Sequence, residues 1–134
     1  MEGGCFCGAL RYEAQGKPVA KGQCHCRACQ QVSGGAPNLF MLMPGEGFRY
    51  TKGSPKTFRR PDSAAGVTRE FCGACGTHVA TRRDGLDQVI LKIGTLDDPA
   101  VYRGPKFALF TAEKQDFHHI PEGVPGFPGF PSGM

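Results

Sequence analysis

Short stretches of alternating apolar and polar residues run along most of the chain, a pattern typical of half-buried strands rather than long helices. The clearest stretches are residues 38–43, a nearly continuous apolar run before Pro44-Gly45, and residues 88–93, which are rich in branched side chains. The segments that suit strands are 9–14, 19–24, 38–43, 48–51, 56–60, 67–72, 78–82, 88–93 and 107–111. Together they predict about eight strands in a folded-over antiparallel sheet or a sandwich, and therefore a mostly β protein.

Two segments depart from this pattern. Residues 27–32 are predicted to form one or two helical turns, which Ser33-Gly34-Gly35 would end. The tail, residues 121–134, holds four prolines, four glycines and one charged residue, which excludes a helix. It is predicted to be flexible or to form an extended strap that contacts the body through Phe127 and Phe130, and we expect only its first half to dock.

Length and composition favour a single domain over residues 1–134. Glycine and proline are abundant, at 20 and 11 residues, which agrees with many turns between short strands. No apolar run approaches the roughly 18 residues that a membrane-spanning helix needs. Residues 1–5 lack the basic and apolar regions of a signal peptide, so we expect a cytoplasmic protein.

The chain carries a mild net charge of +4, and its basic residues concentrate in the middle of the sequence. They are Arg49, Lys52, Lys56, Arg59, Arg60, Arg69, Arg82 and Arg83. Such a segment is most often a solvated face; the alternatives are an anion-binding rim and, after it, a nucleic-acid surface. A nucleic-acid domain usually has a higher pI and a recognisable motif, so the sequence disfavours a nucleic-acid partner.

Seven cysteines gather in three tight clusters, and none of them is isolated. The clusters are Cys5-Phe6-Cys7, Cys24-His25-Cys26-Arg27-Ala28-Cys29 and Cys72-Gly73-Ala74-Cys75. An odd number cannot pair completely within one chain, and the cytosol keeps thiols reduced, so the clusters favour metal binding over disulfides. Soft thiolates gathered in this way select zinc among the common metals of the cell.

The first predicted metal site, which we call the quartet, consists of Cys5, Cys7, Cys72 and Cys75. Sulfurs two residues apart share one face of an extended strand, so the first two are expected to act from a strand. Residues 72–75 form a knuckle, a tight turn in which Gly76 can take a positive φ. Four thiolates complete a tetrahedron and close a long loop, so this zinc is predicted to be structural. The alternative is a set of buried or disulfide-bonded cysteines.

The second predicted metal site, which we call the trio, consists of Cys24, Cys26 and Cys29. Three sulfurs leave one position of a tetrahedral zinc for a histidine, an aspartate, water or a substrate, and an open position can do chemistry. In an extended segment, His25 points away from the face that its two neighbouring cysteines share. Further candidate ligands are His78, His118 and His119, although each histidine is more simply a hydrogen-bonding or surface residue. The alternatives are a second structural zinc and an iron–sulfur cluster, for which the usual ferredoxin spacings are missing.

An open zinc site with three thiolates is suited to thiol chemistry. Its negative charge makes the metal a weaker Lewis acid than a three-histidine zinc, so it activates bound water less well. A bound thiol instead has its pKa lowered, and the thiolate is the reactive nucleophile. The trio is therefore predicted to be catalytic, with a captured thiol attacking a small electrophile such as a carbonyl carbon.

Five motifs stand in order along the chain. They are Gly4-Cys5-Phe6-Cys7-Gly8, Cys24-His25-Cys26-Arg27-Ala28-Cys29-Gln30, Ser33-Gly34, Phe71-Cys72-Gly73-Ala74-Cys75-Gly76 and Gly94-Thr95-Leu96-Asp97-Asp98-Pro99. On these motifs, and over about residues 3–130, the chain resembles the glutathione-dependent formaldehyde-activating enzyme family, which includes centromere protein V. Each motif alone is weak, but the ordered set is specific.

The resemblance implies a zinc-containing β-tent fold of antiparallel sheets with short helical turns. It implies that the quartet holds a structural zinc and that the trio holds a second zinc, where glutathione binds in the founding enzyme. That enzyme is assigned to joining glutathione with formaldehyde into S-hydroxymethylglutathione, which is formally a carbon–sulfur lyase reaction in reverse.

The predicted function is therefore a zinc-dependent carbon–sulfur lyase-type enzyme that acts on the adduct of glutathione, or a similar thiol, with a small aldehyde such as formaldehyde. Glutathione carries two carboxylates, so basic side chains should line its site. Arg27, which lies inside the second motif, is the predicted thiol-binding residue. The alternative is that Arg27 is an ordinary surface arginine. The competing function is a non-catalytic, zinc-stabilised module that binds a protein or nucleic acid, supported only by the basic middle segment. A third is thiol-based metal or redox buffering.

Overall fold

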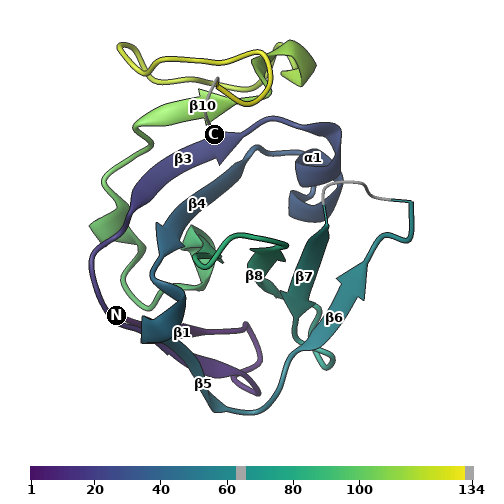
Figure 1. The fold of residues 1–134 in the computed structure, drawn as a ribbon, viewed down its shortest axis with the longest axis vertical. Coiled ribbons are helices and arrows are strands. Elements are labelled where there is room, and N and C mark those ends of the chain that lie inside the picture. The colour runs from purple at the N-terminus through teal and green to yellow at the C-terminus, as the bar shows by residue number, and fades with distance from the viewer. Residues whose placement is uncertain (63–65, 132–134) are drawn as a thin grey trace.

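Strands dominate the secondary structure and form two sheets (Figure 1). The computed structural model describes residues 1–62 and 66–131. The smaller sheet has the order β1 (Glu2–Gly4), β2 (Arg11–Ala14) and β5 (Phe48–Lys52). The larger sheet has the order β10 (Phe107–Leu109), β3 (Ala20–Cys24), β4 (Asn38–Met43), β9 (Val89–Lys92), β8 (His78–Arg83), β7 (Val67–Phe71) and β6 (Lys56–Arg59). The prediction of a mostly β protein is confirmed.

Helical structure is limited to short segments. The helix α1 (Arg27–Ser33) starts at Cys26, whose sulfur accepts a hydrogen bond from the Cys29 backbone N–H at 3.3 Å. It ends at Gly34, where a φ of 84° gives the left-handed cap that favours glycine. The remaining helical segments are the 3-10 turns η1 (Gly45–Gly47), η2 (Ile93–Thr95), η3 (Pro99–Tyr102) and η4 (Thr111–Glu113). Within the described residues, no helix has the length and apolar character needed to cross a membrane.

Each segment that the alternation predicts contains a strand, and β4 has the predicted bounds. The strand that the pattern does not predict is β1, because Glu2-Gly3-Gly4 contains no residue that favours strands. It forms because it pairs with β2, with Gly3 opposite Tyr12. The expectation that Cys5 and Cys7 lie on a strand is wrong, since both lie in the connection between β1 and β2.

The register of the larger sheet gives it two chemically different faces. Neighbouring strands are antiparallel except β10 and β3, which run parallel. Met41 lies opposite Leu91, and Phe40 lies opposite Lys92. Because successive side chains of a strand point to opposite faces, the first pair shares one face and the second pair shares the other. The first face packs toward the smaller sheet, and the second face carries Cys24.

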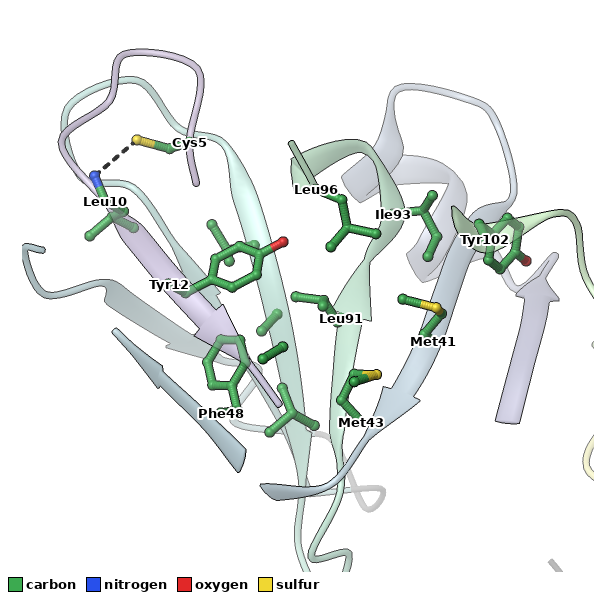
Figure 2. Close-up of a cluster of buried hydrophobic side chains, with 14 of the residues drawn as sticks. Cys5, Leu10, Tyr12, Met41, Met43, Phe48, Leu91, Ile93, Leu96 and Tyr102 are labelled. Carbon is green, nitrogen blue, oxygen red and sulfur yellow. Dashed lines mark hydrogen bonds between the residues drawn. The ribbon is translucent and has the colours of Figure 1, made fainter. Parts of the chain in front are cut away.

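The hydrophobic core lies between the two sheets (Figure 2). Tyr12 and Phe48 come from the smaller sheet, and they face Met41, Met43 and Leu91 of the larger one. All five side chains are at most 7% exposed. Burying this apolar area stabilises the pairing of the sheets by about 25 cal/mol for each Å² removed from water.

The motif at residues 94–99 joins the end of β9 to the smaller sheet. The Arg11 guanidinium donates two hydrogen bonds to the Asp97 carboxylate, at 2.9 and 2.5 Å. The buried Tyr12 hydroxyl lies 2.8 Å from the Thr95 hydroxyl. Both contacts cross from β2 to the segment after β9, so this motif has a structural role here.

The tail docks along the free edge of β10. The Ala108 backbone N–H donates to the Pro125 carbonyl, and the Phe127 N–H donates back to the Ala108 carbonyl, each at 2.9 Å. An edge strand offers unpaired backbone groups of this kind, and a tail that cannot form a helix can pair with them. In Figure 1 the tail accordingly runs beside β10 at the top of the view.

The second half of the tail also docks, so the expectation that only its first half contacts the body is wrong. The Phe110 backbone N–H donates to the Gly129 carbonyl at 3.4 Å, and the Phe110 and Phe130 ring centroids lie 4.9 Å apart. Aromatic packing therefore holds the second half of the tail as well as the first. Residues 132–134, the end of the predicted tail, lie outside the described residues.

Truncation of a core side chain tests the packing between the sheets. Leu91→Ala is expected to lower the free energy of unfolding by about 2–5 kcal/mol, because Leu91 is fully buried and its loss leaves a cavity. Leu39→Ala removes the same atoms from a side chain that is 41% exposed, and about 1 kcal/mol or less is expected. Urea denaturation of the metal-loaded protein measures both values. Equal losses would show that the core lies elsewhere.

Candidate metal centres and the adjoining cavity

The quartet comes together where the β1–β2 connection meets the turn between β7 and β8. Its four sulfurs lie within 4.8 Å of one another, with the Cys7 sulfur 3.7 Å from those of Cys5 and Cys72. The Leu10 backbone N–H donates to the Cys5 sulfur at 3.2 Å, and the Cys75 N–H donates to the Cys72 sulfur at 3.4 Å. Four sulfurs this close, two of them accepting backbone hydrogen bonds, could hold a metal ion and suit zinc.

The turn between β7 and β8 has a backbone conformation and hydrogen bonds that suit the quartet. Gly76 has a φ of 79°, the left-handed conformation that the knuckle sequence predicted. Hydrogen bonds from the Thr77 hydroxyl and then from its backbone N–H lower the pKa of Cys75 to about 5. The thiolate, which is the form that ligates a metal, is therefore favoured at this cysteine. The Thr77 hydroxyl also accepts a hydrogen bond from the Phe6 N–H at 3.1 Å, which ties the two halves of the site together.

The trio lies where β3 passes into α1. Cys24 ends β3, Cys26 caps α1 and Cys29 lies in the first turn, so their sulfurs lie within 4.8 Å of one another. Hydrogen bonds from Cys24 and Cys29 lower the pKa of Cys26 to about 2, and the contact with Cys26 raises the pKa of Cys24. The trio thus favours at least one thiolate. Three soft donors in this arrangement could hold a metal ion with a position left for another ligand.

The four histidines occupy two separate places. His25 points away from the trio as predicted: its ring is fully buried and its Nδ1 lies 3.1 Å from Nδ1 of His118. His119 is exposed next to this pair, whereas His78 lines the same cavity as the trio. Among the described residues, no histidine lies close enough to either cysteine group to complete it as a ligand.

A cavity of about 770 Å³ opens on the second face of the larger sheet, with the trio in its wall. Apolar residues from β4, β9 and β10 contribute to its lining, namely Phe40, Ile90 and Leu109. Charged residues also line it, namely Arg60, Asp62, Arg69, Arg83 and Lys92. A mainly apolar cavity with a few charged groups is typical of small-molecule sites. The excess of cations favours an anionic ligand.

Arg69 and Lys92 are the cations that act on the trio. Burial lowers the pKa of Lys92 to about 8, and the nearby Cys29 opposes this shift. The positive charge of Arg69 contributes to the lowered pKa values of Cys26 and Lys92. Within the described residues, neither cation forms a salt bridge, so both can bind an incoming anion.

A β-bulge in β8 turns His78 toward the cavity. Ala80 lies opposite Glu70, but Phe71 lies opposite His78, so β8 has one extra residue here. Without the bulge, His78 and the buried Ala80 would share one face. Burial lowers the pKa of His78 to about 3, which keeps the ring neutral. Its Nε2 lies 3.2 Å from both the Ala80 carbonyl and the Thr81 hydroxyl.

Arg27, the predicted thiol-binding residue, is not among the residues that line this cavity. Its guanidinium donates to Gln30 Oε1 at 2.5 Å, and its backbone N–H donates to Glu113 Oε1 at 3.0 Å. Both contacts stabilise the start of α1. A role in thiol binding stays a prediction for Arg27.

Phe130 of the tail closes one side of the cavity. Its ring packs against Phe110, and the Arg83 guanidinium carbon lies 4.6 Å from its centroid in a cation–π contact. All three residues line the cavity. Because Phe110 follows β10 and Arg83 belongs to β8, the tail bridges two strands that are far apart in the sheet order.

Comparison with known proteins agrees with this fold. Among solved structures, a Rhodobacter sphaeroides protein matches with a TM-score of 0.64 at 16% identity, covering 95% of this chain and 100% of that one; this likeness concerns the fold alone. No curated protein matches the sequence. Residues 1–113 match the family model described as glutathione-dependent formaldehyde-activating enzyme. Because this match covers most of the length of the chain, the chain belongs to the glutathione-dependent formaldehyde-activating enzyme family.

Proposed function

We propose that the protein is a zinc-dependent enzyme that binds glutathione, or a similar thiol, and makes or cleaves its adduct with a small aldehyde such as formaldehyde. The observation that carries this proposal is the position of the trio in the wall of a cationic, mainly apolar cavity. Family membership supports glutathione and formaldehyde as the substrate class. The proposal includes a cytoplasmic location, where glutathione and reduced cysteines coexist.

The two cysteine groups have different roles in this proposal. The quartet would hold a structural zinc, because it joins segments 65 residues apart and already has four sulfurs. The trio would hold a second zinc, whose chemistry is to lower the pKa of an incoming thiol. Cys24, Cys26 and Cys29 are thus both metal ligands and part of the catalytic site.

Recognition of the thiol is assigned to the cations of the cavity. Glutathione has two carboxylates, and Arg69 and Lys92, whose charges act on the trio, would bind one of them beside the sulfur. Both belong to strands of the larger sheet, so their positions are fixed by backbone pairing. Arg83 lies at the tail side of the cavity and is available to the second carboxylate. Guanidinium groups suit this task because they bind carboxylates through two parallel hydrogen bonds.

The apolar part of the cavity suits the aldehyde. Phe40, Ile90 and Leu109 exclude water from the space beside the sulfurs, which strengthens electrostatic contacts there. In the forward direction a carbon–sulfur bond forms between the thiol sulfur and the carbonyl carbon, and the proton lost by the thiol ends on the aldehyde oxygen. The reverse reaction breaks that bond and returns the proton. His78 adds a neutral imidazole to the same wall.

A binding module for nucleic acid finds less support. Basic residues of the middle segment are engaged with carboxylates: Arg49 pairs with Glu13 at 3.0 Å, and Arg59 pairs with Asp84 at 2.6 Å. Paired surface cations offer little net charge to phosphates. Arg69 and Arg83 of the same segment form no salt bridge within the described residues and line the cavity, which favours a small anionic ligand.

The two zinc sites are distinguished by matched serine variants. Cys7→Ser is expected to remove one zinc ion per chain and to lower the free energy of unfolding by about 4 kcal/mol or more. Cys7 is exposed, so lost packing contributes little to this effect. Cys26→Ser is expected to remove the other zinc with a smaller loss, because the trio closes only a short loop. Intact-protein mass spectrometry and chemical denaturation measure both quantities, and equal destabilisation would contradict the assignment.

Thiol binding is tested by calorimetric titration of the zinc-loaded protein with glutathione. Saturable binding of one glutathione per chain is expected, and Cys26→Ala should abolish it. X-ray absorption at the zinc edge should show an added sulfur ligand when glutathione is present. If the wild-type protein gives no heat and its metal coordination stays unchanged, the proposed function is refuted.

The position of the carboxylate site is tested by arginine variants. Arg69→Ala is expected to weaken glutathione binding about 10-fold, the value of one charge-assisted hydrogen bond. Arg49→Ala is the matched control, since that exposed arginine pairs with Glu13 outside the cavity. Arg27→Ala tests whether the arginine that the sequence predicts to bind the thiol also contributes. A loss in Arg27→Ala together with none in Arg69→Ala would move the anion site to the start of α1.

A further inference from the structure

A buried pair of histidines, His25 and His118, lies behind the trio and faces away from its cavity. His25 stands between Cys24 and Cys26 in the chain and is 0% exposed, and His118 is 6% exposed. Their ring centroids lie 5.0 Å apart, and their Nδ1 atoms lie 3.1 Å apart. Two imidazoles buried in contact need a specific set of hydrogen bonds to be stable there.

The contacts of His118 fix which of its nitrogens carries the hydrogen. Nε2 lies 2.7 Å from the Gly35 carbonyl, which can only accept, so Nε2 is the donor. The Gln115 backbone N–H donates to Nδ1 at 3.2 Å, so Nδ1 carries the lone pair. His118 is therefore a neutral ring that presents an acceptor toward His25.

The contacts of His25 are complementary. Since Nδ1 of His118 accepts, Nδ1 of His25 must donate across the 3.1 Å contact. Nε2 of His25 then accepts from the Gln23 side-chain amide at 3.0 Å, and the same amide donates to the His119 carbonyl at 3.1 Å. In this arrangement the single lone pair of His118 Nδ1 is shared between the Gln115 N–H and the His25 Nδ1–H, and the other hydrogens of the network each have an acceptor of their own.

The backbone of His25 is held as firmly as its ring. Its N–H donates to the Leu109 carbonyl at 2.9 Å, and its carbonyl accepts from Gln30 Nε2 at 2.7 Å. Gln30 Nε2 also donates to the Glu113 carbonyl at 2.9 Å. The residue between two cysteines of the trio is thus attached to β10, to α1 and to the segment that follows β10.

We propose that His25 and His118 are positioning residues for the trio, and this inference rests on the metal role proposed for the trio. Rotation of His25 would displace Cys24 and Cys26, which flank it, so the hydrogen-bonded pair fixes the spacing of their sulfurs. His118 comes from a segment 93 residues away in sequence, and it completes the site without touching the metal or the substrate. Such outer partners of metal ligands tune how tightly a metal is held.

Zinc release measures this role without any thiol present. His118→Ala is expected to transfer one of its two zinc ions to a chromogenic chelator about 10-fold faster than the wild type does. His118→Asn keeps an acceptor near the position of Nδ1 and is expected to restore most of the retention. His119→Ala, a change in the exposed neighbour, should match the wild type. A folded His118→Ala protein that releases both ions at wild-type rates overturns the proposal.

A second measurement uses the wild-type, zinc-loaded protein and needs no variant to fold. Nitrogen NMR shifts of the imidazoles should show hydrogen on Nε2 of His118 and on Nδ1 of His25. The reversed tautomer in either ring would break the network and overturn the proposal. If zinc release depends on His118 as expected but the wild-type protein binds no glutathione, only the proposed function is refuted. The failure of the proposed function and the failure of this inference are therefore distinguishable.

Discussion

The junction of the quartet is the constraint on which the remaining structure depends. It fixes the β1–β2 connection against the β7–β8 turn, two segments that are far apart in sequence and belong to different sheets. This attachment holds the sheets face to face, so that Tyr12 and Phe48 can reach the core. The same turn leads directly into β8, which carries His78 and Arg83 in the cavity wall.

The larger sheet serves two purposes through strict alternation. Met41 and Leu91 fill the core on one face, and Phe40 and Lys92 line the cavity on the other. A single strand thus contributes to stability and to the site at once. A shift of one residue in register would send Lys92 into the core, and the cost of burying that charge opposes such a shift.

Much of this arrangement is predictable from the sequence, because strand alternation and cysteine spacing are local properties. The trio follows from spacing within one segment, whereas the quartet joins two clusters 65 residues apart and depends on the division of seven sulfurs into four and three. The cavity depends on register between distant strands, which spacing does not reveal. Lys92 therefore appears in the sequence only as a polar position in an apolar strand, and Arg27 is the more visible candidate because it lies inside a motif. Alternation does not predict that His78 faces the cavity, because the bulge in β8 adds one residue and reverses the face on which His78 lies. The sequence pattern does not predict β1 either, because the stability of this strand comes from pairing with β2.

The tail has a consequence for how the protein can diversify. The family match ends at residue 113, whereas Phe130, beyond that boundary, forms part of the cavity wall. Both cysteine groups and the packed interior lie inside the shared region. Variation in the tail can therefore reshape the cavity wall without disturbing either cysteine group, so the shape of the cavity and the grouping of the sulfurs are free to change separately.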